Sequence, residues 1–510
     1  MRPITQGSQL KKGTMLSYLN ILANALSTLI LTFFMTRALG DSEYGLYTLI
    51  GAMAAYFAVF DFGLGNAIIR YVAKYQTEHD TVGESNFLAL CMGIYALIAM
   101  VVAVAGFFLA RHVDAFFNLT PAQIPRAQTM AQILIVNLIL TLFVNAFTGI
   151  LSGREHFVFP RVCTVVRIVV RVAAVFVLLN AGHDSVSIVI IDTVLTVLTL
   201  LLLIWYTLIR LRVPIRLSNI DFPLLKEVFS FSFYIFVAML VDLLYWQTGS
   251  LLLGARKHTA AVTPYGQVSQ LRSMYMLLST AISGVFLPKI TRMEVQKAPP
   301  QAFTDILIKT GRLQFIILGL LLAGFVGAGK PFTLLWVGDT SGVVYQISLL
   351  FMLALTVPLI QTIGISILQA KNKHRFRALS YLLITAVCVT MGALLVDSLG
   401  IWGVALATIV SLVLGNTILM NIYYHRMIKL DIPRFFKEVS RGIVPSLLLA
   451  AGTGVLLALI PALQTLPLLS FVTAGAGDAI VYTACLALFG LNGEERALVR
   501  LYLKNFTRRG

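Results

Sequence analysis

Long apolar segments follow one another along almost the whole chain, and only short polar stretches separate them. A helix needs about 20 consecutive apolar residues to cross the hydrocarbon core of a bilayer. The pattern therefore predicts an all-α, polytopic membrane protein with about 14 spans, which we place at residues 15–36, 45–68, 87–110, 128–151, 162–180, 186–209, 228–253, 265–287, 308–328, 345–368, 377–396, 402–423, 442–460 and 467–489.

The Lys and Arg residues are distributed unequally between the two sets of predicted loops. With the N-terminus in the cytoplasm, 30 of the 39 fall on the cytoplasmic side, six fall outside, and Arg167, Arg171 and Arg272 lie within spans. Cytoplasmic loops carry the excess of basic residues in membrane proteins. We therefore expect a multi-pass protein of the bacterial inner membrane with both termini in the cytoplasm.

A weak internal repeat relates the two halves of the chain. Leu39-Gly40 after the first predicted span matches Leu253-Gly254 after the seventh, and the end of the fourth span, from Gly149, matches the end of the tenth, from Gly364. The offsets are 214 and 215 residues. Parallel repeats are a feature of transporters. We predict two six-helix lobes in parallel pseudo-repeat, residues 1–217 and 218–430, followed by two further helices and a basic tail in residues 431–510.

Composition narrows the possible functions. Hydrophobic residues make up 58% of the 510 positions and charged residues only 12%, so lipid is the expected solvent. The net charge of +17 lies in loops between apolar segments, which indicates topology and contact with membrane lipids rather than nucleic acid. The four cysteines have no metal-ligand spacing, and there is no Walker-type phosphate-binding sequence. We expect no catalytic residues, no metal site and no resident cofactor, and hence no enzyme.

Three arginines lie where hydrocarbon is expected, and charges there usually face a cavity or a partner. Arg167 and Arg171 are four residues apart and share one helix face. Arg167 can either reach the cytoplasmic headgroups or line a cavity. Arg171 lies about 15 Å into its span, too deep to reach them, which favours a water-filled cavity. Arg272 stands in a polar stripe with Tyr275, which indicates either a lumen or a seam between helices.

Other predicted spans also carry polar side chains. Asn20 and Asn24 share a face of the first span, and Trp246 follows one turn after Asp242 in the seventh. Arginines pair with phosphate oxygens, whereas Asn, Tyr and Trp suit sugars. We predict a bulky, anionic, sugar-like ligand bound by Arg171, Arg272, Arg167, Asn24, Asn20, Tyr275 and Trp246. Asp61 and Asp242 would balance the arginine charge or carry a coupling ion, H⁺ or Na⁺. We interpret Asp192 and Asp478 as structural.

Two motifs in the first predicted hairpin resemble a known family. They are TRALGDSEYGLY at Thr36–Tyr47 and DFGLGNAIIRY at Asp61–Tyr71. Both resemble the polysaccharide biosynthesis/export family, the O-antigen-type oligosaccharide-lipid flippases, whose superfamily also holds multidrug and toxin extrusion transporters and lipid II flippases. The resemblance implies flipping of undecaprenyl-pyrophosphate-linked oligosaccharide from the inner to the outer leaflet by alternating access between two lobes. It also implies, as further partners, a polysaccharide polymerase and chain-length proteins.

Two other functions remain open on the sequence. A cation-coupled multidrug exporter of the same superfamily usually has an acidic or aromatic cavity, and the deep arginines weigh against it. A membrane polysaccharide polymerase or glycosyltransferase usually has a substantial outer loop or a cytoplasmic domain with catalytic carboxylates. The predicted loops are too short for either.

Overall fold

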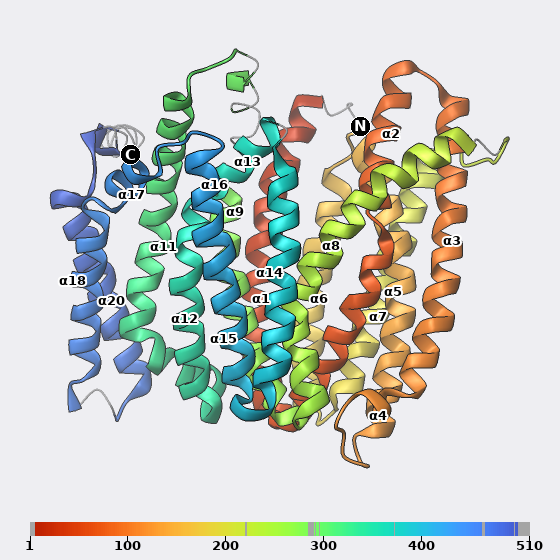
Figure 1. Ribbon diagram of the computed structural model, residues 1–510. Coiled ribbons are helices and arrows are strands. Elements are labelled where there is room, and N and C mark those ends of the chain that lie inside the picture. Colours follow the sequence, from red (N-terminus) through yellow and green to blue (C-terminus); the bar gives the residue numbers. More distant parts are fainter. Residues whose placement is uncertain are drawn as a thin grey trace, which may run out of the picture. The chain divides into compact units, whose positions relative to one another are not determined.

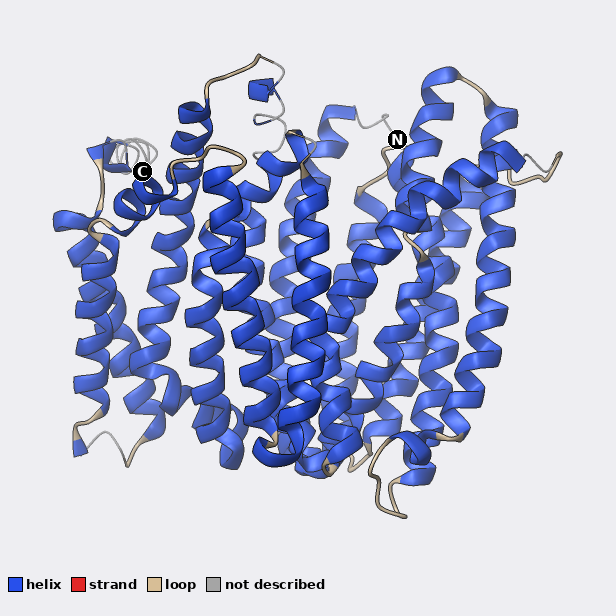
Figure 2. Ribbon diagram, viewed as in Figure 1, coloured by secondary structure: helices blue, strands red, loops and turns tan. Residues whose placement is uncertain are grey.

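The computed structural model describes residues 6–219, 222–283, 290, 292–294, 296–371, 373–461, 465–493 and 495–497. Helices joined by short loops make up this part of the chain, and Figure 2 shows no strand in it. The prediction of an all-α protein is thus confirmed. The chain divides into two compact units, one of Met1–Gly266 with Ala393–Val404 and one of Gln267–Gly392 with Ala405–Gly510.

The first unit begins with a very long helix. Helix α1 (Gln6–Ala58) is kinked at Gly40, whose φ of 73° and ψ of 170° are not helical. A 3₁₀ turn, η1 (Val59–Asp61), leads from α1 to α2 (Leu64–Glu78). The unit continues with α3 (Thr81–Arg111), α4 (Val113–Phe116), α5 (Ile124–Gly153), α6 (Val158–Asn180), α7 (Ser185–Ile204), the π-helix η2 (Trp205–Arg210), α8 (Phe222–Arg256) and η3 (Thr259–Ala261).

The second unit contains most of α9 (Val262–Ser283) and of the hairpin formed by α14 and α15, whose tip belongs to the first unit. Its elements are visible in Figure 1 from green to blue. They are α11 (Pro300–Val337), η4 (Gly338–Thr340), α12 (Ser341–Ile360), α13 (Thr362–Ala370), α14 (His374–Leu399), α15 (Ile401–Leu412), the π-helix η5 (Val413–Leu419), α16 (Met420–Arg426), α17 (Ile432–Ser440), α18 (Ile443–Ala458), α20 (Pro467–Cys485) and the π-helix η6 (Leu486–Gly490).

Local sequence signals set several helix ends. The side chains of Asp80, Asp184 and Asp431 each accept a hydrogen bond from a backbone N–H three residues further on, at 2.8, 3.3 and 3.0 Å. Each thereby satisfies a donor that the first helical turn leaves free. Between η1 and α2 the chain turns through Phe62 and Gly63, which both have positive φ. This turn places the buried Asp61 at the N-terminus of α2.

The expected count of 14 spans is not confirmed. In the described part of the chain, ten helices are long and apolar enough to cross a membrane, or eleven if the bent pair α17 and α18 forms one span. The first two predicted spans fall together in Leu19–Glu78, a single 60-residue segment. At 1.5 Å per residue its helical length of about 90 Å exceeds a hydrocarbon core of about 30 Å, so this one segment is long enough for both. Part of the predicted span 265–287 lies outside the described residues.

Apolar side chains face both inward and outward. The first unit has a buried core of residues such as Leu46, Tyr71, Tyr95 and Ile150. Large apolar side chains on α6, Val169 and Val177 among them, are exposed. Lipid is the solvent that suits such a surface. The predicted division into lobes at residues 217 and 430 stays a prediction.

Candidate functional site

Arg171 lies beside a carboxylate of the neighbouring helix. From α6, its guanidinium donates to both oxygens of Asp192 on α7, with Nε–Oδ1 at 2.5 Å and Nη2–Oδ2 at 3.0 Å. It also donates to the Tyr47 hydroxyl of α1 at 3.3 Å. The side chains of Arg171 and Asp192 are 24% and 18% exposed. The fork of an arginine matches a carboxylate in this two-bond geometry. Asp192 therefore balances the charge of Arg171, which we expected to face a water-filled cavity.

Arg167 lies one turn earlier on the same face of α6 and has a different environment. Its Nη2 donates to the Thr196 hydroxyl of α7 at 2.9 Å. Among the described residues, no carboxylate oxygen lies within 4.0 Å of it. The Asn137 amide of α5 donates to the hydroxyls of Thr193 and Thr196 at 3.3 and 3.0 Å. Arg167 is half-buried, so its charge is held among hydroxyl and amide groups.

These contacts form one polar cluster across four helices of the first unit, which we call the α6–α7 arginine cluster. Its members are Tyr47, Asn137, Arg167, Arg171, Asp192, Thr193 and Thr196. Two arginines and one carboxylate leave it with a formal charge of +1. A net positive, partly exposed group of this kind attracts an anion, and its hydroxyl and amide groups offer hydrogen bonds to a sugar. Sequence reasoning did not connect Asp192, Thr193 and Thr196 with the two arginines.

Asp61 accepts hydrogen bonds from neutral donors. Its Oδ1 accepts from the Tyr95 hydroxyl of α3 at 3.0 Å and from the Asn145 amide of α5 at 3.3 Å. The backbone N–H groups of Gly63 and Gly65 also donate to its carboxylate. The carboxylate thus ties the turn before α2 to two neighbouring helices. The role in balancing arginine charge that we gave it stays a prediction.

The asparagines predicted on the first span are in different environments. Asn20 is buried, and its amide donates to the backbone carbonyl of Arg161 on α6 at 3.2 Å. Asn24 is exposed. On α8, Asp242 is exposed, whereas Trp246 is partly buried with its ring edge-on to Tyr245 at 4.6 Å. These residues belong to the first unit, but the α6–α7 arginine cluster includes none of them.

The polar stripe of α9 in the second unit contacts neighbouring helices. Arg272 is 4% exposed, and its guanidinium carbon lies 5.6 Å from the centre of the Phe351 ring of α12. The Tyr275 hydroxyl lies 2.9 Å from the Thr356 hydroxyl, also on α12. One turn after Tyr275, the Ser279 hydroxyl donates to the backbone carbonyl of Leu359 and accepts from the Gln314 amide of α11. The sequence left open whether this stripe lines a lumen or forms a seam between helices, and these contacts are those of a seam.

Two cavities lie within single units, and none of the predicted binding residues lines either one. A cavity of about 440 Å³ in the first unit is almost entirely apolar, and its lining includes Phe57, Phe60, Phe116 and Leu251. A cavity of about 620 Å³ in the second unit is lined by charged side chains from α11, α17 and the C-terminal segment, Lys309, Arg312 and Glu495 among them.

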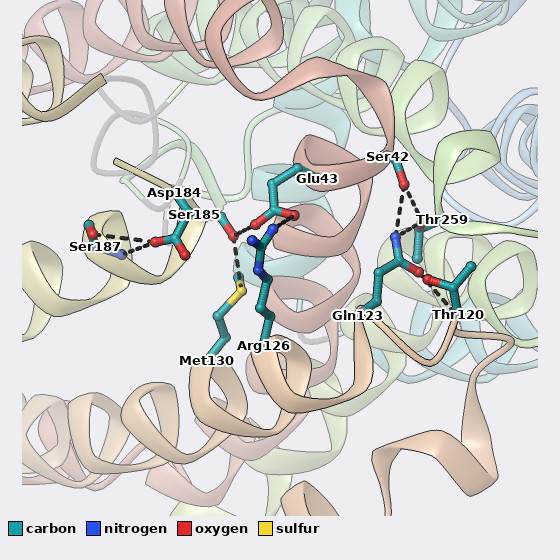
Figure 3. Close-up of polar contacts among 10 residues, drawn as sticks. All are labelled: Ser42, Glu43, Thr120, Gln123, Arg126, Met130, Asp184, Ser185, Ser187 and Thr259. Carbon is teal, nitrogen blue, oxygen red and sulfur yellow. Dashed lines mark hydrogen bonds and ion pairs between the residues drawn. The ribbon is translucent and has the colours of Figure 1, made fainter. Parts of the chain in front are cut away.

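The first of the two sequence motifs forms a set of contacts that sequence reasoning did not foresee. Figure 3 shows Gln123 at the start of α5 donating to the hydroxyls of Ser42 and Thr259, at 2.8 and 2.9 Å. Glu43 accepts from Arg126 at 3.1 Å and from the Ser185 hydroxyl of α7 at 2.6 Å. The motif therefore connects α1 to α5, α7 and η3. The density of polar residues beside Gly40 is the signal that could have indicated it.

Comparison with known proteins identifies the family. The family model "Polysaccharide biosynthesis protein" matches residues 10–294, more than half of the chain. The chain belongs to the polysaccharide biosynthesis protein family. The expected family membership is thus confirmed, and the match extends well beyond the two motifs.

The similar proteins agree with this assignment. The chain is 24% identical over 410 residues to the uncharacterized membrane protein EpsK of Bacillus subtilis (strain 168), covering 78% of this chain and 79% of EpsK. It is 21% identical over 408 residues to a putative O-antigen transporter of Shigella flexneri, covering 76% and 92%.

Solved structures show the same fold at low sequence identity. The lipid II flippase MurJ, in an inward closed conformation, matches with a TM-score of 0.72 and 14% identity over 92% of this chain and 98% of MurJ. An inward-facing MATE multidrug transporter of the MOP superfamily matches with a TM-score of 0.62 and 12% identity over 81% and 95%. The chain is thus a membrane protein with the fold of these solved proteins, and the names of the similar proteins are those of transporters and flippases rather than enzymes.

Proposed function

We propose that this protein flips an undecaprenyl-pyrophosphate-linked oligosaccharide from the inner to the outer leaflet of the bacterial cytoplasmic membrane, for synthesis of a cell-surface polysaccharide. The family match over residues 10–294 carries the proposal. The similarity to a putative O-antigen transporter and the fold of a lipid II flippase support it. The protein works by alternating access and acts with a polymerase and chain-length proteins.

The α6–α7 arginine cluster gives the proposal its chemistry. A lipid-linked oligosaccharide carries its negative charge on the pyrophosphate, which arginine recognises through paired N–H groups. Arg167 has a hydroxyl and no carboxylate as its described partner, so its charge is available to that anion. Asp192 holds Arg171 in place beside it. We propose that H⁺ or Na⁺ drives the cycle.

The test is complementation of a deletion strain. We expect Arg167→Ala and Arg171→Ala to lose surface polysaccharide and to accumulate lipid-linked oligosaccharide, with Arg167→Ala still present in the membrane at normal levels. Arg161→Ala is the matched control, because Arg161 is an exposed residue at the start of the same helix. Normal polysaccharide from both variants would exclude these arginines from binding. Unchanged lipid-linked intermediates in the deletion strain would exclude the function itself.

A cation-coupled multidrug exporter is the second candidate, and the similarity to a MATE transporter favours it. Such a protein would change the susceptibility of the cell to cationic drugs and leave surface polysaccharide intact. A drug panel on the same deletion strain therefore separates the two functions. Increased drug susceptibility with normal polysaccharide would favour the exporter.

A further inference from the structure

A carboxyl group is enclosed among three helices of the second unit. Helices α11, α18 and α20 pack against one another, as Figure 1 shows for α18 and α20. Asp478 lies in the middle of α20 and is 0% exposed. Neither of its carboxyl oxygens has a hydrogen-bond partner among the described residues. We had interpreted Asp478 as structural from its isolation in the sequence, but a buried polar group without a partner is rare and costly.

Two glycines form the walls of this site. A methyl group at Gly454 of α18 would overlap both carboxyl oxygens of Asp478, and one at Gly327 of α11 would overlap Oδ2. The carboxyl therefore lies directly against the backbones of two other helices.

Among the described residues, no ion-pair partner balances an ionised Asp478. Helix α18 has no ionisable residue, and Asp478 is the only charged residue of α20. On α11 the nearest charged residue along the helix is Lys330, which is exposed, and no Lys, Arg or His nitrogen of the described residues lies within 4.0 Å of the carboxyl. Tyr482, one turn along α20, donates its hydroxyl to the backbone of Ile316 at 2.9 Å.

The environment of Asp478 favours a proton over a metal cation as the ligand. An ionised carboxylate without a partner costs several kcal/mol when it is buried, whereas the neutral acid avoids this penalty. A metal cation would need several ligands, and the described residues contain no group of three or more His, Cys, Asp or Glu side chains that could hold one. We propose that Asp478 is a proton-binding site, which holds α20 against α11 and α18 as the neutral acid and loosens this packing when it ionises.

Proton binding at Asp478 makes the stability of the protein depend on pH. An exposed aspartate loses its proton near pH 4. If folded Asp478 keeps its proton above that pH, unfolding releases a proton, and stability falls as the pH rises. Asparagine has the size and neutrality of the protonated acid. We therefore expect the melting temperature of the purified full-length protein to fall from pH 5 to pH 9 by several degrees more in the wild type than in Asp478→Asn. Parallel curves for the two proteins would overturn the proposal.

Infrared spectroscopy tests the protonation state directly. The C=O band of a protonated carboxyl should be present in the wild type at pH 7 and absent from Asp478→Asn, or from Asp478→Ala if the first variant does not accumulate. A wild-type spectrum that lacks such a band at Asp478 would show that the carboxyl is ionised, and would overturn the proposal.

The glycine walls provide matched controls on the same helices. We expect Gly454→Ala to lower the melting temperature, and Gly452→Ala to leave it nearly unchanged, because a methyl group at Gly452 meets nothing within 4 Å. Gly327→Ala and Gly324→Ala form the same comparison on α11. Asp478→Ala should partly rescue Gly454→Ala by removing the oxygens that the methyl group meets. Equal stability of Gly454→Ala and Gly452→Ala would contradict the enclosed site. None of these measurements depends on the transported substrate, so they can fail while the proposed function holds.

Discussion

Arg171 shows how a membrane protein accommodates a deep charge at the scale of one residue. Its depth in the span excludes the headgroups, so it needs either water or a partner within the protein. The partner is Asp192, which lies 21 residues further on, on the next helix. The pair leaves Arg167, one turn away, as the cluster's surplus positive charge. A residue that was expected to bind substrate thus first stabilises the packing of α6 against α7.

The contribution of the Arg171–Asp192 pair to the free energy of unfolding can be measured by removing one partner. Asp192→Asn leaves Arg171 with an uncompensated charge, and we expect a loss of about 3–5 kcal/mol in the free energy of unfolding. The control is Asp397→Asn, because Asp397 and Arg256 form an ion pair whose side chains are 58% and 57% exposed. Exposed pairs contribute about 0.2–1 kcal/mol. Thermal unfolding in detergent measures both, and similar losses for the two variants would show that Arg171 is solvated rather than dependent on Asp192.

Helix α1 shows how a single element is positioned by its contacts with other elements. Its kink at Gly40 and the polar residues that follow it connect α1 to three other elements of the first unit. Gly45 lies where α1 passes closest to η3, since a methyl group there would overlap the backbone carbonyl oxygen of Thr259. Because the backbone of α1 lies against the backbone of η3 at this point, no flexible side chain can move aside to make room for a methyl group. Gly45 therefore fixes how closely α1 and η3 approach each other.

A pair of substitutions on this helix tests that interpretation. Gly45→Ala should destabilise the protein by about 1–3 kcal/mol, which is the typical cost of overpacking a well-packed interior. Gly51→Ala should be neutral or stabilising by up to about 1 kcal/mol, because a methyl group at Gly51 meets nothing within 4 Å and alanine favours a helix. Both are read from thermal unfolding. A loss at Gly51 as large as that at Gly45 would attribute the effect to α1 itself rather than to its contact with η3.

At the scale of the whole molecule, the family match shows a polysaccharide biosynthesis protein, and the fold is the one seen in the lipid II flippase MurJ. The described residues contain ten helices long and apolar enough to cross a membrane, or eleven with the bent pair, and one 60-residue segment overlaps two of the predicted spans. Orientation in the membrane remains a prediction that rests on the basic loops.

Reporter fusions test that orientation. An alkaline phosphatase fused after Thr120, between α4 and α5, should be active because we predict this loop to be outside. Fusions after Glu155, between α5 and α6, and after Gly510 should be inactive, and a fluorescent reporter at Gly510 should be bright. The reverse pattern would invert the topology, and activity at both Thr120 and Glu155 would show that α5 does not cross the membrane.

The sequence by itself determined the all-α membrane architecture, the family and the set of charges that needed explanation. These follow from it because helices in lipid satisfy their backbone internally, so the length and polarity of each segment can be read without knowledge of its neighbours. The two motifs at Thr36–Tyr47 and Asp61–Tyr71 indicated the family before any contact was known.

Only the tertiary structure decided what each polar side chain meets. The sequence could place Arg171, Asp192 and Asp478 at depths in their spans, but not in rotation about the helix axes relative to one another. That rotation brings Asp192 to Arg171, and it brings two glycine backbones to Asp478 instead of a cation. Pairing across helices depends on packing between segments that are distant in sequence, and a periodic pattern along one helix does not specify it.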